Sequence, residues 1–184
     1  MPNKIVDANY RFIAAYNEVN ARIAQRQQAL TLYVSIVVGL LAATVALRPN
    51  SGNAATPIEW LALGFPIASI CFAFLNYKAE RAITNLRMFL SELEQIGTAN
   101  QHLPSYNTDP KWSLIANKAR RFHDYSAALL VAFGNAIGLG AAKAIFPQRF
   151  IDAPEFMYVA IALALSAFVT VLLTPQWSYA PKSV

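Results

Sequence analysis

Two polar side chains inside an apolar stretch are the residues best placed to do chemistry. Asp124 begins the stretch 124–146, and Asn135 follows eleven residues later, about three helical turns on. Both side chains therefore share one helix face, which small residues continue at Gly138 and Ala142. If this face lined a pore between several subunits, Asn135 would form a polar ring in mid-membrane and Asp124 an anionic ring that favours cations.

The same face has a second interpretation, in which it packs against another helix. An amide in lipid needs a hydrogen-bond partner, so Asn135 would then join neighbouring helices. Small residues allow helix backbones to approach closely, and Gly134 lies next to this face. A similar small-residue face occurs in the first apolar stretch, at four-residue spacing. Its members, which we expect to be helix-packing positions, are Ser35, Gly39 and Ala43.

The remaining reactive side chains do not indicate an enzyme. His102 and His123 are far apart, and the sequence has no zinc-protease, dithiol or nucleophile-elbow motif. His123 beside Asp124 is expected to make an ordinary interfacial hydrogen bond, the alternative being a group that titrates near neutral pH. The single cysteine, Cys71, allows no intrachain disulfide and is expected to be a buried thiol. We therefore expect no catalytic residue, no cofactor and no metal site.

The composition is that of a membrane protein. Of 184 residues, 56% are hydrophobic and only 14% are charged, with a mean hydropathy of +0.35. Four apolar stretches are long enough to cross a bilayer as helices, at 29–47, 60–77, 124–146 and 156–174. The predicted fold class is all-α: a polytopic membrane protein with four transmembrane helices and amphipathic cytoplasmic helical extensions.

Charge asymmetry sets the expected orientation. Twelve of the fifteen Lys and Arg residues flank the spans on one side, which places both termini and the middle segment in the cytoplasm. The predicted parts are a cytoplasmic amphipathic helix (1–28), a first transmembrane hairpin (29–77), a cytoplasmic helical segment (78–123), a second transmembrane hairpin (124–175) and a cytoplasmic tail (176–184). Loops are expected at 48–58, 98–110 and 147–155, where turn-forming residues gather.

An apolar stripe runs along the first predicted helix at helical spacing. Its members are Phe12, Tyr16, Val19 and Ile23. The stripe is a candidate seam between subunits of a homo-oligomer. Packing on neighbouring helices of the same chain and contact with the membrane surface are the alternatives.

Basic residues gather beside the spans on the predicted cytoplasmic side. They are Arg22, Arg26, Lys111, Lys118, Arg120 and Arg121. Contact with the anionic headgroups of the lipid bilayer explains such a cluster. The alternative is a phosphate-bearing ligand, either a nucleotide or a single-stranded nucleic acid, with Trp112 or Phe122 as a stacking surface.

The layout resembles the small multi-span membrane effectors of bacterial antiphage defence systems. The shared features are four short spans, a long amphipathic lead-in at 5–23 and no enzyme motif. The resemblance implies a bacterial inner (plasma) membrane protein, a homo-oligomer, and a soluble sensor protein whose signal opens it so that ion gradients are lost.

The predicted function is therefore a homo-oligomeric membrane pore or ion-channel-like effector, gated from the cytoplasmic side and acting in antiviral defence by membrane disruption. The alternative is a non-conducting membrane scaffold that recruits a soluble partner through its cytoplasmic helices. A small transporter is the third interpretation, and it ranks last because Pro66 is the only proline inside a span.

Overall fold

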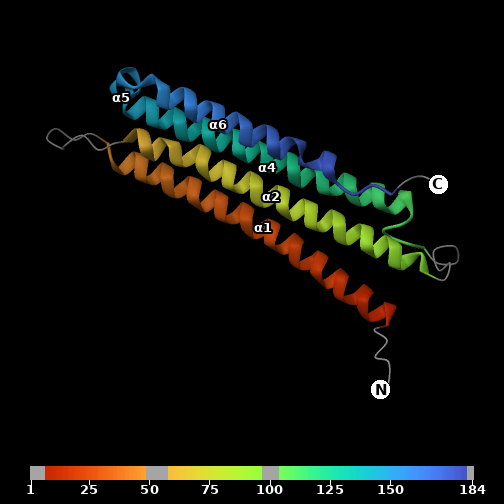
Figure 1. The fold of residues 1–184 in the computed structure, drawn as a ribbon. Helices are drawn as coiled ribbons and strands as arrows, with labels where there is room; N and C mark the ends of the chain where they lie inside the picture. Colours follow the sequence, from red (N-terminus) through yellow and green to blue (C-terminus); the bar gives the residue numbers. More distant parts are fainter. Residues whose placement is uncertain (1–6, 49–57, 97–103, 182–184) are drawn as a thin grey trace.

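The computed structural model describes residues 7–48, 58–96 and 104–181, and within these ranges every regular element is a helix. The described elements are four long helices, drawn in Figure 1, and two short ones. Their bounds are α1 Ala8–Ala46, α2 Ile58–Glu94, α4 Pro110–Ile145, α5 Pro147–Asp152, α6 Pro154–Leu173 and the 3-10 helix η2 Thr174–Trp177. Much of the predicted loops 48–58 and 98–110 lies outside the described residues.

Helix starts follow from local sequence. The side chain of Asp7 caps α1 by accepting a hydrogen bond from the Asn9 amide, and Asp109 caps α4 through the Lys111 amide. The helices α4, α5 and α6 all begin with proline, which has no amide hydrogen to leave unpaired in a first turn. The predicted loop 147–155 therefore contains a short helix, which corrects that prediction.

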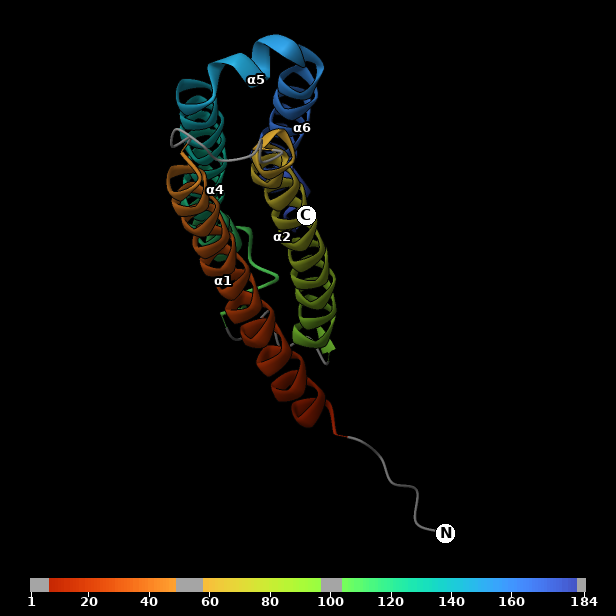
Figure 2. The ribbon, with the colours of Figure 1, turned by 90° about the vertical axis from the view of Figure 1, so that its left-hand side faces the viewer.

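The four long helices run antiparallel in chain order (Figure 1). The helices α1 and α4 begin, and α2 ends, at one end of the bundle, toward which α6 runs, whereas α5 lies at the other. We call the first the basic end and the second the α5 end. Figure 1 shows the start of α1 leaning away from the other helices at the basic end, and Figure 2 shows α5 linking α4 to α6 at the α5 end.

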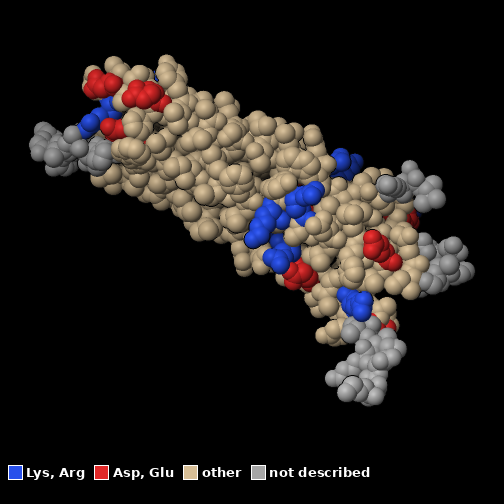
Figure 3. Space-filling view, in the orientation of Figure 1, with Lys and Arg blue, Asp and Glu red and all other residues tan. Residues whose placement is uncertain are grey.

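All four long helices are long and apolar enough to cross a membrane, which confirms the predicted number of candidate spans. Figure 3 shows a wide uncharged surface between charged residues at the two ends. Aromatic pairs lie near both edges of this surface: Trp60 with Phe156, at 5.2 Å between ring centroids, and Tyr77 with Trp177, at 5.0 Å. Trp60 and Tyr77 are about 25 Å apart along α2, close to the thickness of a bilayer core.

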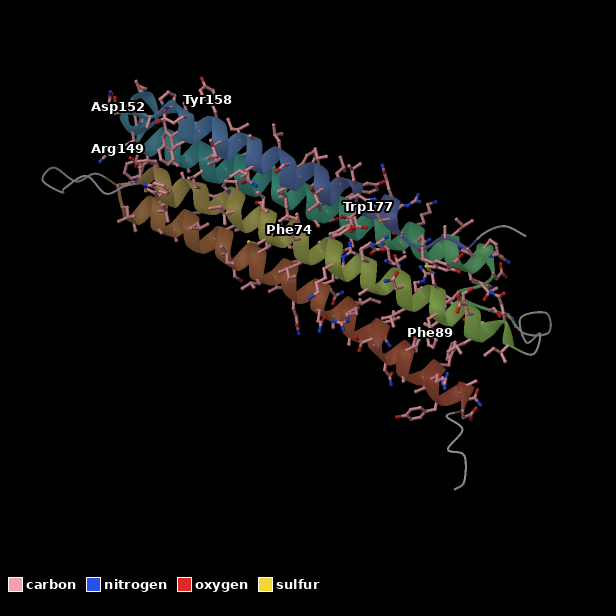
Figure 4. All side chains as sticks on the ribbon, viewed as in Figure 1. Phe74, Phe89, Arg149, Asp152, Tyr158 and Trp177 are labelled. Carbon is pink, nitrogen blue, oxygen red and sulfur yellow. The ribbon has the colours of Figure 1, made fainter. Side chains whose placement is uncertain are left out.

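The span region has small residues inside and large apolar residues outside. One interhelical cluster joins Ala73, Ala127 and Ala128 to Phe72 and Val171, and a second contains three more alanines. By contrast, Leu129, Phe133 and Ile137 are exposed on the outer face of α4, and Phe74 and Tyr158, labelled in Figure 4, are also exposed. Small interior residues let the helices approach closely, and the outer residues suit lipid.

Candidate functional site

A buried charge cluster joins three helices where the uncharged surface meets the basic end. It consists of Arg26 on α1, Glu80 on α2, and Arg120 and Asp124 on α4. The two oxygens of Glu80 accept from the two arginines, one from each, with Arg26 Nη1 at 3.1 Å. Arg26 also forms an ion pair with Asp124. Glu80 and Asp124 are at most 1% exposed, so both carboxylates depend on these cations.

Neutral side chains extend this cluster to the end of α6. Arg26 Nε donates to the Asn76 side-chain oxygen at 2.6 Å, and the Asn76 amide donates to the Thr174 hydroxyl at 3.5 Å. Thr174 opens η2, so one arginine on α1 is connected to all three of the other long helices. Two arginines and two carboxylates make the cluster neutral. This balance favours a role in holding the helices together over a role in catalysis.

Burial shifts the pKa of two groups at this level. Burial lowers the pKa of Arg26 to about 10, and the nearby charge of Glu80 partly offsets that effect, so Arg26 stays protonated at neutral pH. Burial also lowers the pKa of His123, and the positive charge of Arg26 adds to the lowering. His123 Nε2 has no hydrogen-bond partner among the described residues. The expected interfacial hydrogen bond of His123 is thus not formed by that nitrogen.

In the middle of the spans a second polar group connects three helices. The Asn135 amide donates to the Ser69 hydroxyl at 2.7 Å, and Ser69 also lies 3.2 Å from the Tyr33 hydroxyl. The residues come from α4, α2 and α1, and all three are buried. These contacts are the ones expected if Asn135 packs against a neighbouring helix, and here that helix belongs to the same chain.

The four pore-lining candidates face the interior of one chain. Asp124 and Asn135 bind the partners described above, and Ala142 is fully buried beside Ala62 and Phe150. Gly138 faces Phe65 of α2 so closely that an added Cβ would lie under 3.0 Å from the ring. The face predicted to surround an axis between subunits is therefore covered by the chain's own helices.

The predicted helix-packing positions divide into two groups. Gly134 packs closely, because a Cβ there would lie 2.9 Å from the Tyr33 hydroxyl. Ala43 is half-buried, but Ser35 and Gly39 are exposed, and no described side chain comes within 4 Å of a Cβ built on Gly39. The small-residue face of the first span thus points mostly outward from the bundle. Cys71 is also exposed rather than buried, because it lies in an open groove between α1 and α2.

The predicted oligomer seam packs partly within the chain. Phe12 and Val19 lie against Ile83 of α2 in a third apolar cluster. Tyr16 and Ile23 are 52% and 39% exposed. The within-chain alternative therefore accounts for half of this stripe.

The predicted basic surface is likewise divided. Arg26 and Arg120 are committed to carboxylates inside the bundle, and Arg22 pairs with Glu18 on its own helix. The remaining members are exposed cations: Lys111, Lys118 and Arg121. Lys111 lies 5.2 Å from the centroid of the Trp112 ring.

A groove of about 420 Å³ opens at the basic end between α1, α2 and α4. Apolar side chains form most of its wall, including Phe12, Val19, Ile83 and Leu90. Arg87 and Arg120 are its cationic residues. Arg87 is 4% exposed and is bound by the side-chain oxygens of Asn107 and Asn117, at 3.3 and 2.6 Å.

The sequence interpretation missed Asn76, Glu80 and Arg87. Glu80 lies between Lys78 and Arg81, in a segment whose charges are typical of a helix surface. The signal was its spacing: Asn76, Glu80 and Arg87 fall four and seven residues apart, on the face that also carries Ile83. Polar residues on the apolar face of a helix indicate a buried polar contact.

No protein-family model, curated protein or solved structure matches the chain. Among the described residues, no group of three or more His, Cys, Asp or Glu side chains is arranged to hold a metal ion. The functional argument therefore rests on the geometry of the two ends of the bundle.

Proposed function

We propose that the chain is a membrane-anchored docking protein, whose basic end receives a soluble, acidic protein in the bacterial cytoplasm. The orientation is supported by charge. The sequence segments that flank the spans on the predicted cytoplasmic side, 1–28, 78–124 and 176–184, contain twelve Lys and Arg against seven Asp and Glu, whereas the rest of the chain has three of each. The entire net charge of +5 thus belongs to these segments.

The spans support anchoring more than conduction. Three buried polar side chains of the spans, Tyr33, Ser69 and Asn135, already contact one another inside one chain. The outer face of α4 carries large apolar residues instead. Helices of the same chain therefore already shield these side chains from lipid.

Exposed apolar side chains beyond the spans are the observation that carries the proposal. At the start of α1, Tyr10 and Ile13 are 70% and 60% exposed. Leu114 and Ile115, in the first turns of α4, are 57% and 58% exposed. These positions lie two or more turns from the apolar spans, so lipid does not cover them, and exposed apolar groups of this size mark interaction sites.

Charge favours a different protein, and not a second copy of this chain, as the partner that binds the basic end. Lys111 and Lys118 are exposed on the same helix as Leu114 and Ile115. Two basic ends would repel each other, whereas an acidic partner would be attracted. In the antiphage interpretation this partner is the soluble sensor.

Photo-crosslinking in intact cells tests the proposal. A benzophenone amino acid at Ile13 or Ile115 should form an adduct with a soluble cytoplasmic protein. The same group at Phe133, which is 61% exposed on the span of α4, should not. Replacing both Lys111 and Lys118 with Glu should abolish the adduct, because an acidic partner would then be repelled. Adducts that form only with a second copy, or that survive the charge reversal, would contradict the proposal.

A second candidate function is the homo-oligomeric pore, opened from the cytoplasmic side. It is favoured by a groove of about 470 Å³ between α4 and α6, which Asn135 and Lys143 line. Asn135 Oδ1 has no hydrogen-bond partner within the described part of the chain. A helix from another subunit that entered this groove would bring a polar group to mid-membrane.

A further inference from the structure

The groove at the basic end contains a positive charge that the described chain does not neutralise. Arg87 donates to the neutral side-chain oxygens of Asn107 and Asn117, and its guanidinium lies 5.5 Å from the centroid of the Tyr179 ring. No ion pair joins Arg87 to a described carboxylate, and Nη2 has no hydrogen-bond partner in the same ranges. A guanidinium this deeply buried normally has an anionic partner.

A second guanidinium faces the same groove. Arg120 pairs with Glu80 through Nη2, but its Nη1 has no partner among the residues that the structure describes. Burial, and then repulsion by Arg120, lower the pKa of Arg87. Both side chains line the groove, so an anion bound there would relieve the repulsion between them.

The rest of the groove suits an apolar or aromatic group. Phe12, Val19 and Leu90 line it, and the rings of Tyr16 and Tyr106 lie at its wall. Its volume of about 420 Å³ is within the range of small-molecule sites. Glu94, the acidic residue of the lining, accepts hydrogen bonds from the Asn107 and Thr108 backbones, and no ion pair between described residues joins it to either arginine.

We propose that this groove binds a phosphate-bearing ligand with an apolar or aromatic body. The phosphate contacts Arg87 and Arg120, since guanidinium groups bind phosphate through paired hydrogen bonds. The body lies along Phe12 and Tyr16. A soluble nucleotide and an anionic phospholipid share this chemistry, and the site requires neither the docking function nor a pore.

Binding to the full chain in phosphatidylcholine nanodiscs tests the proposal in two arms. Isothermal titration calorimetry with ATP measures binding of a soluble nucleotide. The change in the unfolding midpoint when phosphatidylglycerol replaces the nanodisc lipid measures binding of an anionic phospholipid. At least one arm should give saturable binding or a raised unfolding midpoint. In the ATP arm, inorganic phosphate should bind more weakly than ATP, because it lacks an aromatic group that could contact the apolar wall of the groove. Equal binding of phosphate and ATP would contradict a ligand with an apolar or aromatic body.

Arg87→Gln is the decisive variant, and Lys118→Gln is its matched control. Arg87→Gln should weaken binding roughly tenfold or more, or remove the lipid-dependent shift, because it removes a charged donor. Lys118→Gln removes the same charge from an exposed position and should leave binding unchanged. The helix content of ligand-free Arg87→Gln checks that the variant is folded, because the substitution also removes the donors to Asn107 and Asn117. Equal binding by both variants, or no effect in either arm, would overturn the proposal.

Discussion

Replacing Arg26 with Met is expected to lower the free energy of unfolding by about 3–5 kcal/mol. Arg26 is the cation that pairs with Asp124, and it also donates to Glu80 and Asn76. Both carboxylates are at most 1% exposed. The variant leaves Asp124 as a buried charge without its ion-pair partner, while Glu80 keeps Arg120. Unfolding in mixed detergent micelles, followed by helix content, measures the loss.

Arg22→Met is the matched control for this prediction. Arg22 lies one turn before Arg26, and its side chain is 35% exposed in a pair with Glu18, which is 43% exposed. An exposed pair of this kind contributes about 0–1 kcal/mol. Adding Asp124→Asn to Arg26→Met should recover part of the loss, because it removes the unpaired charge. Equal losses for Arg22→Met and Arg26→Met, or no recovery in the double variant, would refute the role of the buried charge cluster.

Adding one methyl group at Gly138 is the second change with a large expected effect. A Cβ at Gly138 would lie closer to the Phe65 ring than real Cβ atoms approach other atoms, and Phe65 is fully buried. Gly138→Ala should therefore separate α4 from α2 and destabilise the bundle by about 1–3 kcal/mol. The same unfolding measurement detects it.

Gly140→Ala provides the control two residues away on the same helix. No atom of the described residues lies within 4 Å of a Cβ at Gly140, apart from the helix's own nearby backbone. The substitution should be neutral or stabilise α4 by up to about 1 kcal/mol through helix propensity. Phe65→Leu should reduce the penalty of Gly138→Ala, because the smaller side chain leaves room. Identical behaviour of the two alanine variants would contradict close packing at Gly138.

The sequence was sufficient to predict the four long helices and the candidate spans. Apolar length located all four, and local signals such as Asp109 before Pro110 mark the start of α4. The continuation of α2 beyond Tyr77 to Glu94 followed from the unbroken periodicity of apolar residues. The helix α5 was missed because two prolines and a short polar segment are also typical of a loop.

The sequence could not determine what covers each helix face. Periodicity placed Asp124 and Asn135 on one face, but the same spacing fits a pore, another subunit or a neighbouring helix of the same chain. The structure adds the partners Arg26 and Ser69, which are distant in sequence. Glu80 was missed for the same reason, since a single acidic residue among basic ones is usually a surface charge.

The partners of Asn135 separate the docking proposal from the pore proposal. In the docking account, Asn135 joins helices by donating to Ser69, so its role is packing. In the pore account, its unpaired oxygen faces other subunits. Asn135→Leu should then affect stability in the first case and conduction in the second, with a packing cost of about 0.6–2 kcal/mol.

Single-channel recording of the purified protein in a planar bilayer is the most direct test of this difference. Wild-type protein and Asn135→Leu are recorded side by side, and the mass of the detergent-solubilised particles is measured for both. The docking account predicts no unitary currents from either protein, with or without an applied voltage. Wild-type currents that disappear in Asn135→Leu, while the particle mass stays the same, would contradict it and establish the pore.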